Sequence, residues 1–461
     1  MSENKFKPVL GLWDGTMLVA GSMIGSGIFI VSADVVRNVG SAGWLVGVWV
    51  ITGFMTITAA VSYGELSGMF PKAGGQYVYL KESYNSLMAF LFGWSFFAVI
   101  QTATIAAVGV AFARFSAYIF PWMGESNKIL SLGFADISAA QLSAILMIAF
   151  LTWINTLGVK EGKIIQSIFT VSKLIALFGL IAFGFLLVDQ SYWSQNWQTG
   201  FSSMQDLGVD GAGKTPVGWT EIGGVALLGA IAAAMTGTLF SSDAWNNVTF
   251  IAGEIKNPKR NIGLSLFLGT LMVTILYVTA NLMYLHVLPL DGIAYPQADR
   301  LAISAANEIF GDAGKLIIAV LIMISTFGCN NGLILAGARV YYTMAKDGLF
   351  FRKAGELNAN SVPQWALWAQ CVVASLLCLS GEYGNLLDMI SFVVVLFYAL
   401  TIGGIFILRR KRPDVERPYK AFGYPFLPAL YIVMGLTFCI LLIIYKPAFT
   451  WPGLIITLMG I

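Results

Sequence analysis

Two clusters of glycine and serine interrupt long apolar stretches of this sequence. The first is GSMIGSGIF at residues 21–29, and the second is GTLFSSDAWNN at residues 237–247. Glycine lacks a side chain and serine competes for backbone hydrogen bonds, so both loosen a helix in its middle. The free backbone N–H groups at the start of the resumed helix favour an anion, because the helix dipole is positive there. The alternative reading is that these small residues only let helices pack closely.

One cation also lies inside an apolar stretch, at Lys173 in FTVSKLIALF. An ionisable residue at the centre of a membrane helix costs about 2.5–3.5 kcal/mol on insertion scales, so it needs partners. Apolar residues flank Lys173 on both sides, which argues against a side chain that snorkels to the membrane surface. We therefore expect Lys173 to contact polar groups inside the protein.

Other residue types argue against an enzyme. The four cysteines all fall in apolar stretches without metal-ligand spacing, and the single histidine, His286, lies at the end of another. The sequence contains no nucleophile–histidine pair and no phosphate-binding loop. We expect no catalytic residue, no metal and no cofactor.

The composition is that of a protein embedded in lipid. The 461 residues are 57% hydrophobic and only 11% charged. A bilayer core of about 30 Å requires roughly 20 apolar residues per helix. Stretches of that kind recur near residues 15–39, 44–68, 85–118, 139–157, 164–188, 222–252, 262–288, 313–344, 364–381, 384–409 and 424–444. A twelfth begins near residue 448, and we expect it to be cut short at Ile461.

Positive charge indicates the orientation of these spans. With a cytoplasmic N-terminus, the inner segments carry 19 of the 27 Lys and Arg residues and the outer segments carry 7. The basic run Arg409–Arg412 then lies on the inner side, as the positive-inside rule requires. The net charge of +3 is therefore a topology signal, and we expect no nucleic-acid partner.

The two interrupted helices occupy matching places, because each opens a set of five spans. This pattern indicates an inverted-repeat protein with its site near the middle of the membrane. We predict an all-α integral membrane protein of 12 transmembrane helices: a five-plus-five inverted repeat with broken helices 1 and 6, then two C-terminal helices. The corresponding domains are residues 1–190, an outer connection 191–221, residues 222–412 and residues 413–461. We also expect short helices within 290–312, and an amphipathic segment along the inner membrane surface at 65–84.

Four motifs in order resemble the amino acid–polyamine–organocation superfamily, and within it the L-type amino acid transporters and their bacterial relatives. They are GSMIGSGIF at 21–29, YGELSGMFPKAGGQYVYL at 63–80, FIAGEIKNPKRNI at 250–262 and LRRKRPDVERPYKAFGYPFLP at 408–428. The resemblance covers essentially the whole chain. It implies transport of amino acids by alternating access across the cell membrane. We expect a bacterial inner membrane, with the N-terminus in the cytoplasm as the charge distribution indicates.

The resemblance also implies a binding site between the broken helices. The backbone N–H groups of Gly25, Ser26 and Gly27 match those that hold the substrate carboxylate. The carbonyls of Met23, Phe240 and Asp243 match those that accept hydrogen bonds from its ammonium group. Ser22 and Ser241 are candidates for the lining, Phe240 matches an aromatic gate, and Trp245 and Asn246 match supporting positions.

Lys173 matches a lysine that fills the place of a sodium ion in sodium-coupled relatives, and Ser325 matches its hydroxyl partner. Sodium independence is therefore expected, although Ser325 and Thr326 also form a hydroxyl pair that suits a sodium site. Asp243 departs from the glycine that many L-type members have. Its carboxylate either strengthens amine binding, favours a cationic side chain, takes up a proton, or caps the unwound helix.

Three functions follow from this reading. The first is a sodium-independent exchanger of neutral L-amino acids. The second is a proton-coupled or exchange carrier of cationic amino acids or polyamines, and the third is a membrane sensor or channel that binds ligand without carrying it. Residues 119–138 contain no cysteine, whereas animal L-type light chains bond a glycoprotein partner there, so no disulfide-linked heavy chain is expected.

Overall fold

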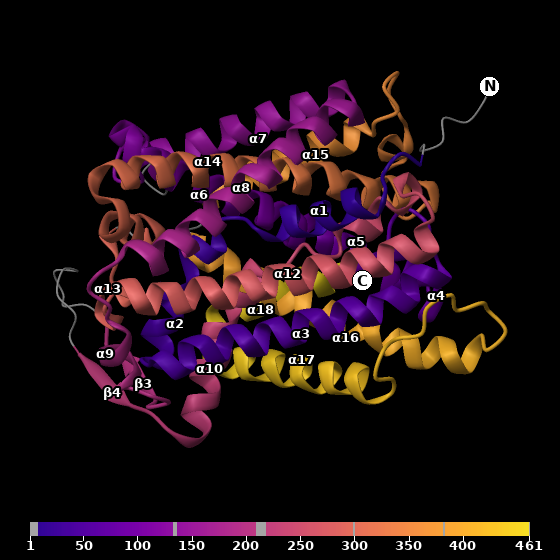
Figure 1. The fold of residues 1–461 in the computed structure, drawn as a ribbon. Coiled ribbons are helices and arrows are strands. Elements are labelled where there is room, and N and C mark those ends of the chain that lie inside the picture. Colours follow the sequence, from indigo (N-terminus) through magenta and orange to yellow (C-terminus); the bar gives the residue numbers. More distant parts are fainter. Residues whose placement is uncertain (1–7, 132–135, 209–217, 298–299, 381–382, 461) are drawn as a thin grey trace.

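The computed structural model describes residues 8–131, 136–208, 218–297, 300–380 and 383–460. Long helices run side by side along the molecule, and strands form only two small hairpins (Figure 1). The first half contains α1 (Leu12–Met23), η1 (Gly27–Phe29), α2 (Val31–Val39), α3 (Ala42–Met69), α4 (Gln76–Ser83), α5 (Ser86–Ser95), the π-helix η2 (Phe96–Ile100), α6 (Gln101–Ile119), η3 (Pro121–Met123), β1 (Lys128–Ser131), β2 (Asp136–Ser138), α7 (Ala139–Leu157) and α8 (Val159–Leu187).

The second half begins with a small layer outside the long helices and then returns to them. It contains α9 (Trp193–Trp197), β3 (Met204–Asp206), β4 (Trp219–Glu221), α10 (Gly224–Ser241), α11 (Asn247–Phe250), η4 (Ala252–Glu254), α12 (Pro258–Val287), α13 (Leu290–Ala294), α14 (Leu301–Lys346), η6 (Arg352–Gly355), α15 (Gln364–Ser380), α16 (Tyr383–Lys411), α17 (Phe426–Tyr445) and α18 (Pro447–Leu458). Within α14 the backbone bends at Gly311, where φ is 67°.

Nine helical segments of the described residues are long and apolar enough to cross a membrane. The other three predicted stretches are shorter as helices. The first is divided into α1 and α2 by its break, α15 has 17 residues, and α18 has 12. The protein is therefore a multi-pass, all-helical membrane protein, with fewer uninterrupted spans than the sequence predicted.

Close helix packing uses glycine where two backbones meet. α12 lies along α3 and also packs on α1 (Figure 1). Gly64 of α3 faces Gly263 of α12, and a methyl group built on Gly263 would lie 3.4 Å from the Gly64 Cα. Gly269 of α12 meets Val19 of α1 in the same way. Small residues at these crossings let the backbones approach, which is the main source of packing between helices in lipid.

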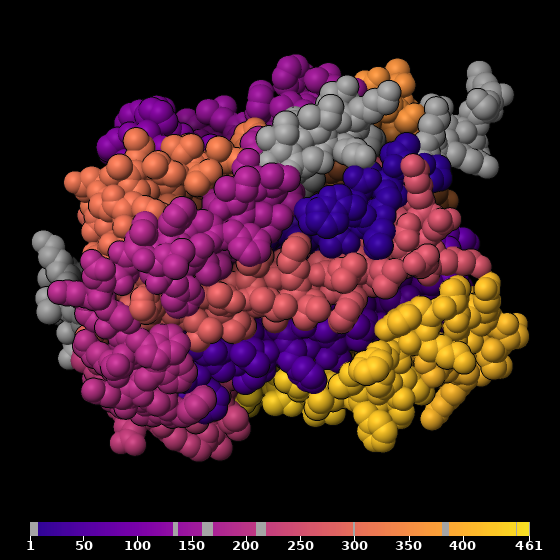
Figure 2. Space-filling model, in the orientation of Figure 1, coloured from indigo at the N-terminus to yellow at the C-terminus, as the bar shows by residue number. Residues whose placement is uncertain are grey.

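The described parts of the long connection before α10, residues 188–208 and 218–223, lie against one end of the bundle. The strands β3 and β4 pair there, and α9 and α13 lie beside them (Figures 1 and 2). Asn196 of α9 donates to the carbonyls of Leu285 and Leu288 and accepts from the amide of Leu290. This one buried side chain therefore fixes the connection to the turn after α12. We call this end of the molecule the hairpin end.

The amphipathic surface helix predicted at 65–84 is wrong in two respects. Residues 65–69 continue α3, and α4 packs against α16 with six of its eight residues buried. Its polar side chains face protein: Lys81 and the Tyr77 hydroxyl both contact the Asp347 carboxylate, at 2.8 and 2.9 Å. The short helices expected within 290–312 are present as α13 and the first turns of α14.

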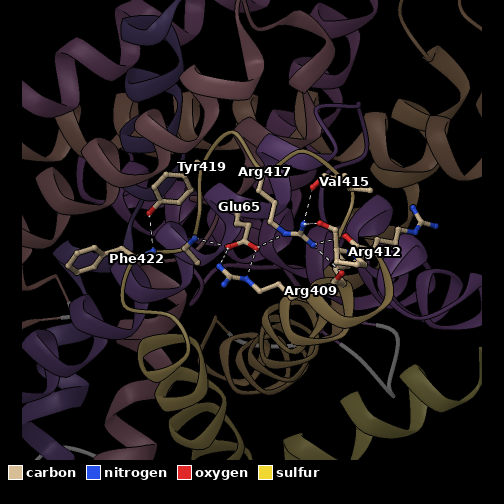
Figure 3. Close-up of polar contacts among 10 residues, drawn as sticks. Glu65, Arg409, Arg412, Val415, Arg417, Tyr419 and Phe422 are labelled. Atoms are coloured by element: carbon tan, nitrogen blue, oxygen red, sulfur yellow. Dashed lines mark hydrogen bonds and ion pairs between the residues drawn. The ribbon is translucent and has the colours of Figure 1, made fainter.

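At the end opposite the hairpin, one buried carboxylate anchors the segment between α16 and α17 (Figure 3). Glu65 of α3 is 1% exposed and accepts two hydrogen bonds from Arg409, at 3.0 and 2.7 Å. The Ala421 amide donates to it at 2.7 Å, and the Arg417 guanidinium lies 3.5 Å away. Arg409 also lies over the Tyr424 ring. Bidentate pairs of this kind are strong and fix geometry, so Glu65 ties three segments together.

Candidate functional site

The first helix breaks where the sequence predicted. α1 ends at Met23, Ile24 has an extended backbone with ψ near 90°, and the chain resumes as η1 at Gly27. A helix end leaves its last carbonyl groups without backbone donors, and in a buried site these need other partners. The amides of Gly25 and Gly27 have no backbone acceptor among the residues that the structure describes.

Lys173 supplies two of the missing donors. Its Nζ lies 2.5 Å from the Gly21 carbonyl oxygen and 2.7 Å from that of Ile24, and the side chain is fully buried. The Ser325 hydroxyl also points at the Ile24 carbonyl, at 3.4 Å. The partners expected for an intramembrane lysine are therefore backbone oxygens of the broken helix. The Lys173 ammonium group is therefore surrounded by carbonyl and hydroxyl oxygens, which are groups that can also bind a monovalent cation.

The sixth helix breaks in the matching manner. α10 ends at Ser241, the backbone turns through Asp243 and Ala244, and helix resumes at Asn247 as α11. Ala244 has φ of 63°, which is unusual for a residue with a side chain. Irregular backbone at this depth survives where it is enclosed by protein.

Tyr277 of α12 joins the two breaks. Its hydroxyl lies 3.0 Å from the Met23 carbonyl and 3.1 Å from the Ser241 carbonyl. A hydroxyl has one proton, so it can donate fully to only one carbonyl at a time. Trp49 packs edge-on against the ring and holds it in place. The Met23 carbonyl, a predicted acceptor for the substrate, is thus already held by the protein.

The two broken helices also touch directly, at Gly27 and Ser241. A methyl group built on Gly27 would lie 1.9 Å from the Ser241 Oγ and 3.0 Å from its Cα. Any side chain at position 27 therefore meets the other helix before it meets a ligand. The Ser241 hydroxyl donates back to the Gly237 carbonyl at 2.8 Å.

Asp243 points toward an aromatic cluster. The Tyr398 hydroxyl donates to its carboxylate at 2.5 Å. The Trp245 ring lies 5.0 Å from that of Tyr398 and 4.8 Å from that of Tyr63, so three rings enclose one side of the carboxylate. Among the described residues no Lys, Arg or His forms an ion pair with Asp243. Its charge is available to a ligand.

Asn246 connects the sixth helix to the buried helix α4. Its side-chain amide donates to the Gln76 carbonyl oxygen at 3.1 Å, and Gln76 donates in turn to the Thr401 hydroxyl. This chain of hydrogen bonds links α4, the second break and α16. Asn246 therefore contacts structural neighbours, which agrees with a supporting position.

Two small cavities lie beside the second break. One of about 20 Å³ is lined by Phe240, Asp243, Trp245 and Tyr398, and one of about 10 Å³ is lined by Asp243 and Asn246 among others. Each has room for about one water molecule, so neither could hold an amino acid in this arrangement of the helices.

The structure brings most of the predicted residues together. Met23, Gly25, Ser26 and Gly27 form the first break, and Phe240, Ser241 and Asp243 the second. Ser22 does not line either cavity, and its hydroxyl is buried without a hydrogen-bond partner.

Sequence reasoning missed Tyr277, Tyr398 and Gln76. An aromatic residue in an apolar helix is normally packing, so the two tyrosines carried no signal, and the partners of Gln76 lie in distant segments of the chain.

The comparisons with known proteins agree with this geometry. The chain matches the amino acid permease family over residues 10–461. It is 29% identical over 433 residues to the serine/threonine exchanger SteT of Bacillus subtilis (strain 168), covering 93% of this chain and 90% of the relative. It is 28% identical to the human b(0,+)-type amino acid transporter 1, covering 96% and 84%, and 28% identical to the human large neutral amino acids transporter small subunit 2, covering 99% and 79%. With two broken helices that meet in its interior and a family match along nearly its whole length, the chain belongs to the amino acid permeases, which are membrane transporters and not enzymes.

Proposed function

We propose that this permease is a sodium-independent exchanger of neutral L-amino acids that works by alternating access. The contacts of Lys173 carry the proposal. Its ammonium group binds the Gly21 and Ile24 carbonyls beside the Ser325 hydroxyl, so a fixed charge supplies what a bound sodium ion would supply. The resemblance to an exchanger of serine and threonine supports exchange and small neutral cargo.

The substrate's charged groups would use the two breaks. We propose that the amides of Gly25, Ser26 and Gly27 bind the carboxylate, because amides at a helix start favour an anion. The carbonyls of Met23 and Phe240 would accept from the ammonium group. A carbonyl oxygen has two lone pairs, so Met23 can accept from both Tyr277 and the substrate.

The layout we propose is the five-plus-five inverted repeat of residues 1–190 and 222–412, followed by two C-terminal helices. The hairpin end would face outward and the end with Glu65 and α4 would face the cytoplasm, together with the N-terminus. This orientation, in a bacterial inner membrane, follows from the excess of Lys and Arg at the inner segments. No disulfide-linked partner is proposed, because residues 119–138 contain no cysteine.

Uptake of labelled serine into proteoliposomes tests the proposal. Uptake should require unlabelled serine inside the vesicles and should be equal in sodium and sodium-free buffers. Uptake that depends on sodium would overturn the role of Lys173. Uptake that is equally fast into empty vesicles would overturn exchange.

A second candidate is a carrier of cationic amino acids or polyamines. It is favoured by Asp243, whose carboxylate lines both cavities and is held only by neutral donors among the described residues. Lysine, arginine or putrescine would then displace labelled substrate, and Asp243→Asn would remove that displacement. If these cations do not compete with the labelled substrate at millimolar concentration, the proposal of a neutral amino acid exchanger stands.

A further inference from the structure

A second pocket lies at the hairpin end, away from the two breaks. It has a volume of about 480 Å³, far larger than the central cavities. Tyr118 at the end of α6, the turn around Tyr295, and the first turns of α14 line it. None of the residues of the first or second break lines this pocket. It is large enough for a small organic solute such as an amino acid.

The pocket lining contains a cation, Arg300, that has no ion-pair partner among the described residues. Arg300 is partly buried in the lining, and its Nε is shielded from solvent without a hydrogen-bond acceptor. Its guanidinium lies 5.9 Å from the Tyr118 ring centroid. No carboxylate forms an ion pair with Arg300 among the residues that the structure describes. Burial, and then the neighbouring Arg114, lower the pKa of Arg300, and the nearby Glu125 carboxylate offsets this only in part.

The other charges of the lining differ from Arg300 in their partners. Lys315 is already paired with Asp312 at 2.9 Å. Glu308 is exposed and accepts from the neighbouring Asn307 amide, and it forms no ion pair among the described residues, although Lys315 is near enough to feel its charge. The pocket therefore presents one open positive and one open negative side chain, together with polar Gln297 and Ser304.

We propose that this pocket is a second binding site for a zwitterionic amino acid, with its carboxylate on Arg300 and its ammonium group toward Glu308. Guanidinium groups bind carboxylates through two parallel hydrogen bonds, and a buried, unsatisfied Nε is the group that such a ligand satisfies. The site would collect cargo at the hairpin end before it reaches the central site. The choice of an amino acid as ligand rests on the proposed transport function.

Selective labelling tests this site without relying on transport. The four native cysteines are all buried, so a Ser304→Cys variant would place one reactive thiol in the pocket lining. Its rate of reaction with a charged methanethiosulfonate reagent would be measured with serine or with sodium sulfate at increasing concentrations. Serine should slow the reaction, and sulfate should do so only weakly.

Arg300 variants made in the Ser304→Cys protein show whether the protection comes from serine bound in this pocket. Arg300→Gln should raise the serine concentration needed for protection at least about tenfold, because a charge-assisted pair is lost. Arg300→Lys keeps the charge but loses the two parallel hydrogen bonds, so its protection should fall between those of the parent and Arg300→Gln. Undiminished protection in Arg300→Gln would assign the effect to the central site and overturn the proposal, as would protection by sulfate alone. Uptake by the parent chain reports the central site separately, so normal uptake without any protection would refute only this pocket.

Discussion

Removing the Tyr277 hydroxyl should weaken substrate binding, because that hydroxyl holds the two breaks together. It lies 3.0 Å from the Met23 carbonyl and 3.1 Å from the Ser241 carbonyl, in a fully enclosed environment. Tyr277→Phe keeps the ring and its contact with Trp49. What is lost is the hydroxyl that contacts the Met23 and Ser241 carbonyls.

The size of the effect follows from the number of protons. One hydroxyl donates one hydrogen bond, so its removal leaves one buried acceptor without a donor, at about 1–3 kcal/mol. If this free energy is lost from the binding-competent arrangement, the Kd for serine rises by roughly 5- to 150-fold. We expect a value within this range.

Tyr284→Phe is the matched control. It lies two turns farther along α12, is equally buried, and donates only to the Ile28 carbonyl at 3.3 Å, beyond the break. Equilibrium binding of labelled serine to both purified variants, with uptake rates measured in parallel, gives the comparison. Equal losses of serine affinity in the two variants would mean that the effect is not specific to the hydroxyl that contacts both breaks. Wild-type affinity in Tyr277→Phe would refute the idea that the Tyr277 hydroxyl holds the two breaks together.

Three further changes test other parts of the structure. Lys173→Met removes the two hydrogen bonds from the ammonium group to the first break and should lower initial uptake at least about tenfold per folded molecule; a normal rate with a normal elution profile would make the lysine structural only. Glu65→Gln leaves buried arginine without its anion and should destabilise the protein by about 3 kcal/mol, whereas Glu416→Gln breaks an exposed pair and should cost less than about 1 kcal/mol; similar shifts in thermal unfolding would contradict this. Gly27→Ala should abolish serine binding because its methyl group would lie 1.9 Å from the Ser241 hydroxyl oxygen. Adding Ser241→Gly should restore part of that binding, and no restoration would instead favour a direct block of the substrate carboxylate.

The two helix breaks lie where the sequence predicted them, because backbone chemistry dominates there. A helix that contains Gly25 and Gly27 loses regularity whatever surrounds it, and a lysine in an apolar stretch must find oxygen atoms. The sequence therefore predicted the positions of both breaks and the need of Lys173 for polar partners. From the sequence, Gly27 was expected only to offer its backbone N–H to the substrate carboxylate. The structure adds a second reason for glycine at this position, because it packs directly against Ser241.

The surface helix at 65–84 failed for a related reason. Its alternation of polar and apolar residues predicts an interface, but α4 lies among polar groups of other helices. Gln76 and Lys81 find a hydroxyl and a carboxylate that are more than two hundred residues away in the chain. A pattern of polarity cannot distinguish water from a protein partner.

Composition, the spacing of apolar stretches and the two glycine–serine clusters by themselves determined a membrane-embedded, helical protein with two broken helices. These features are local, since hydrophobicity and backbone freedom belong to each segment alone. Only the tertiary structure decided which groups complete the breaks. Tyr277, Tyr398 and Glu65 act through partners that are distant in sequence, and their roles exist only once the helices pack.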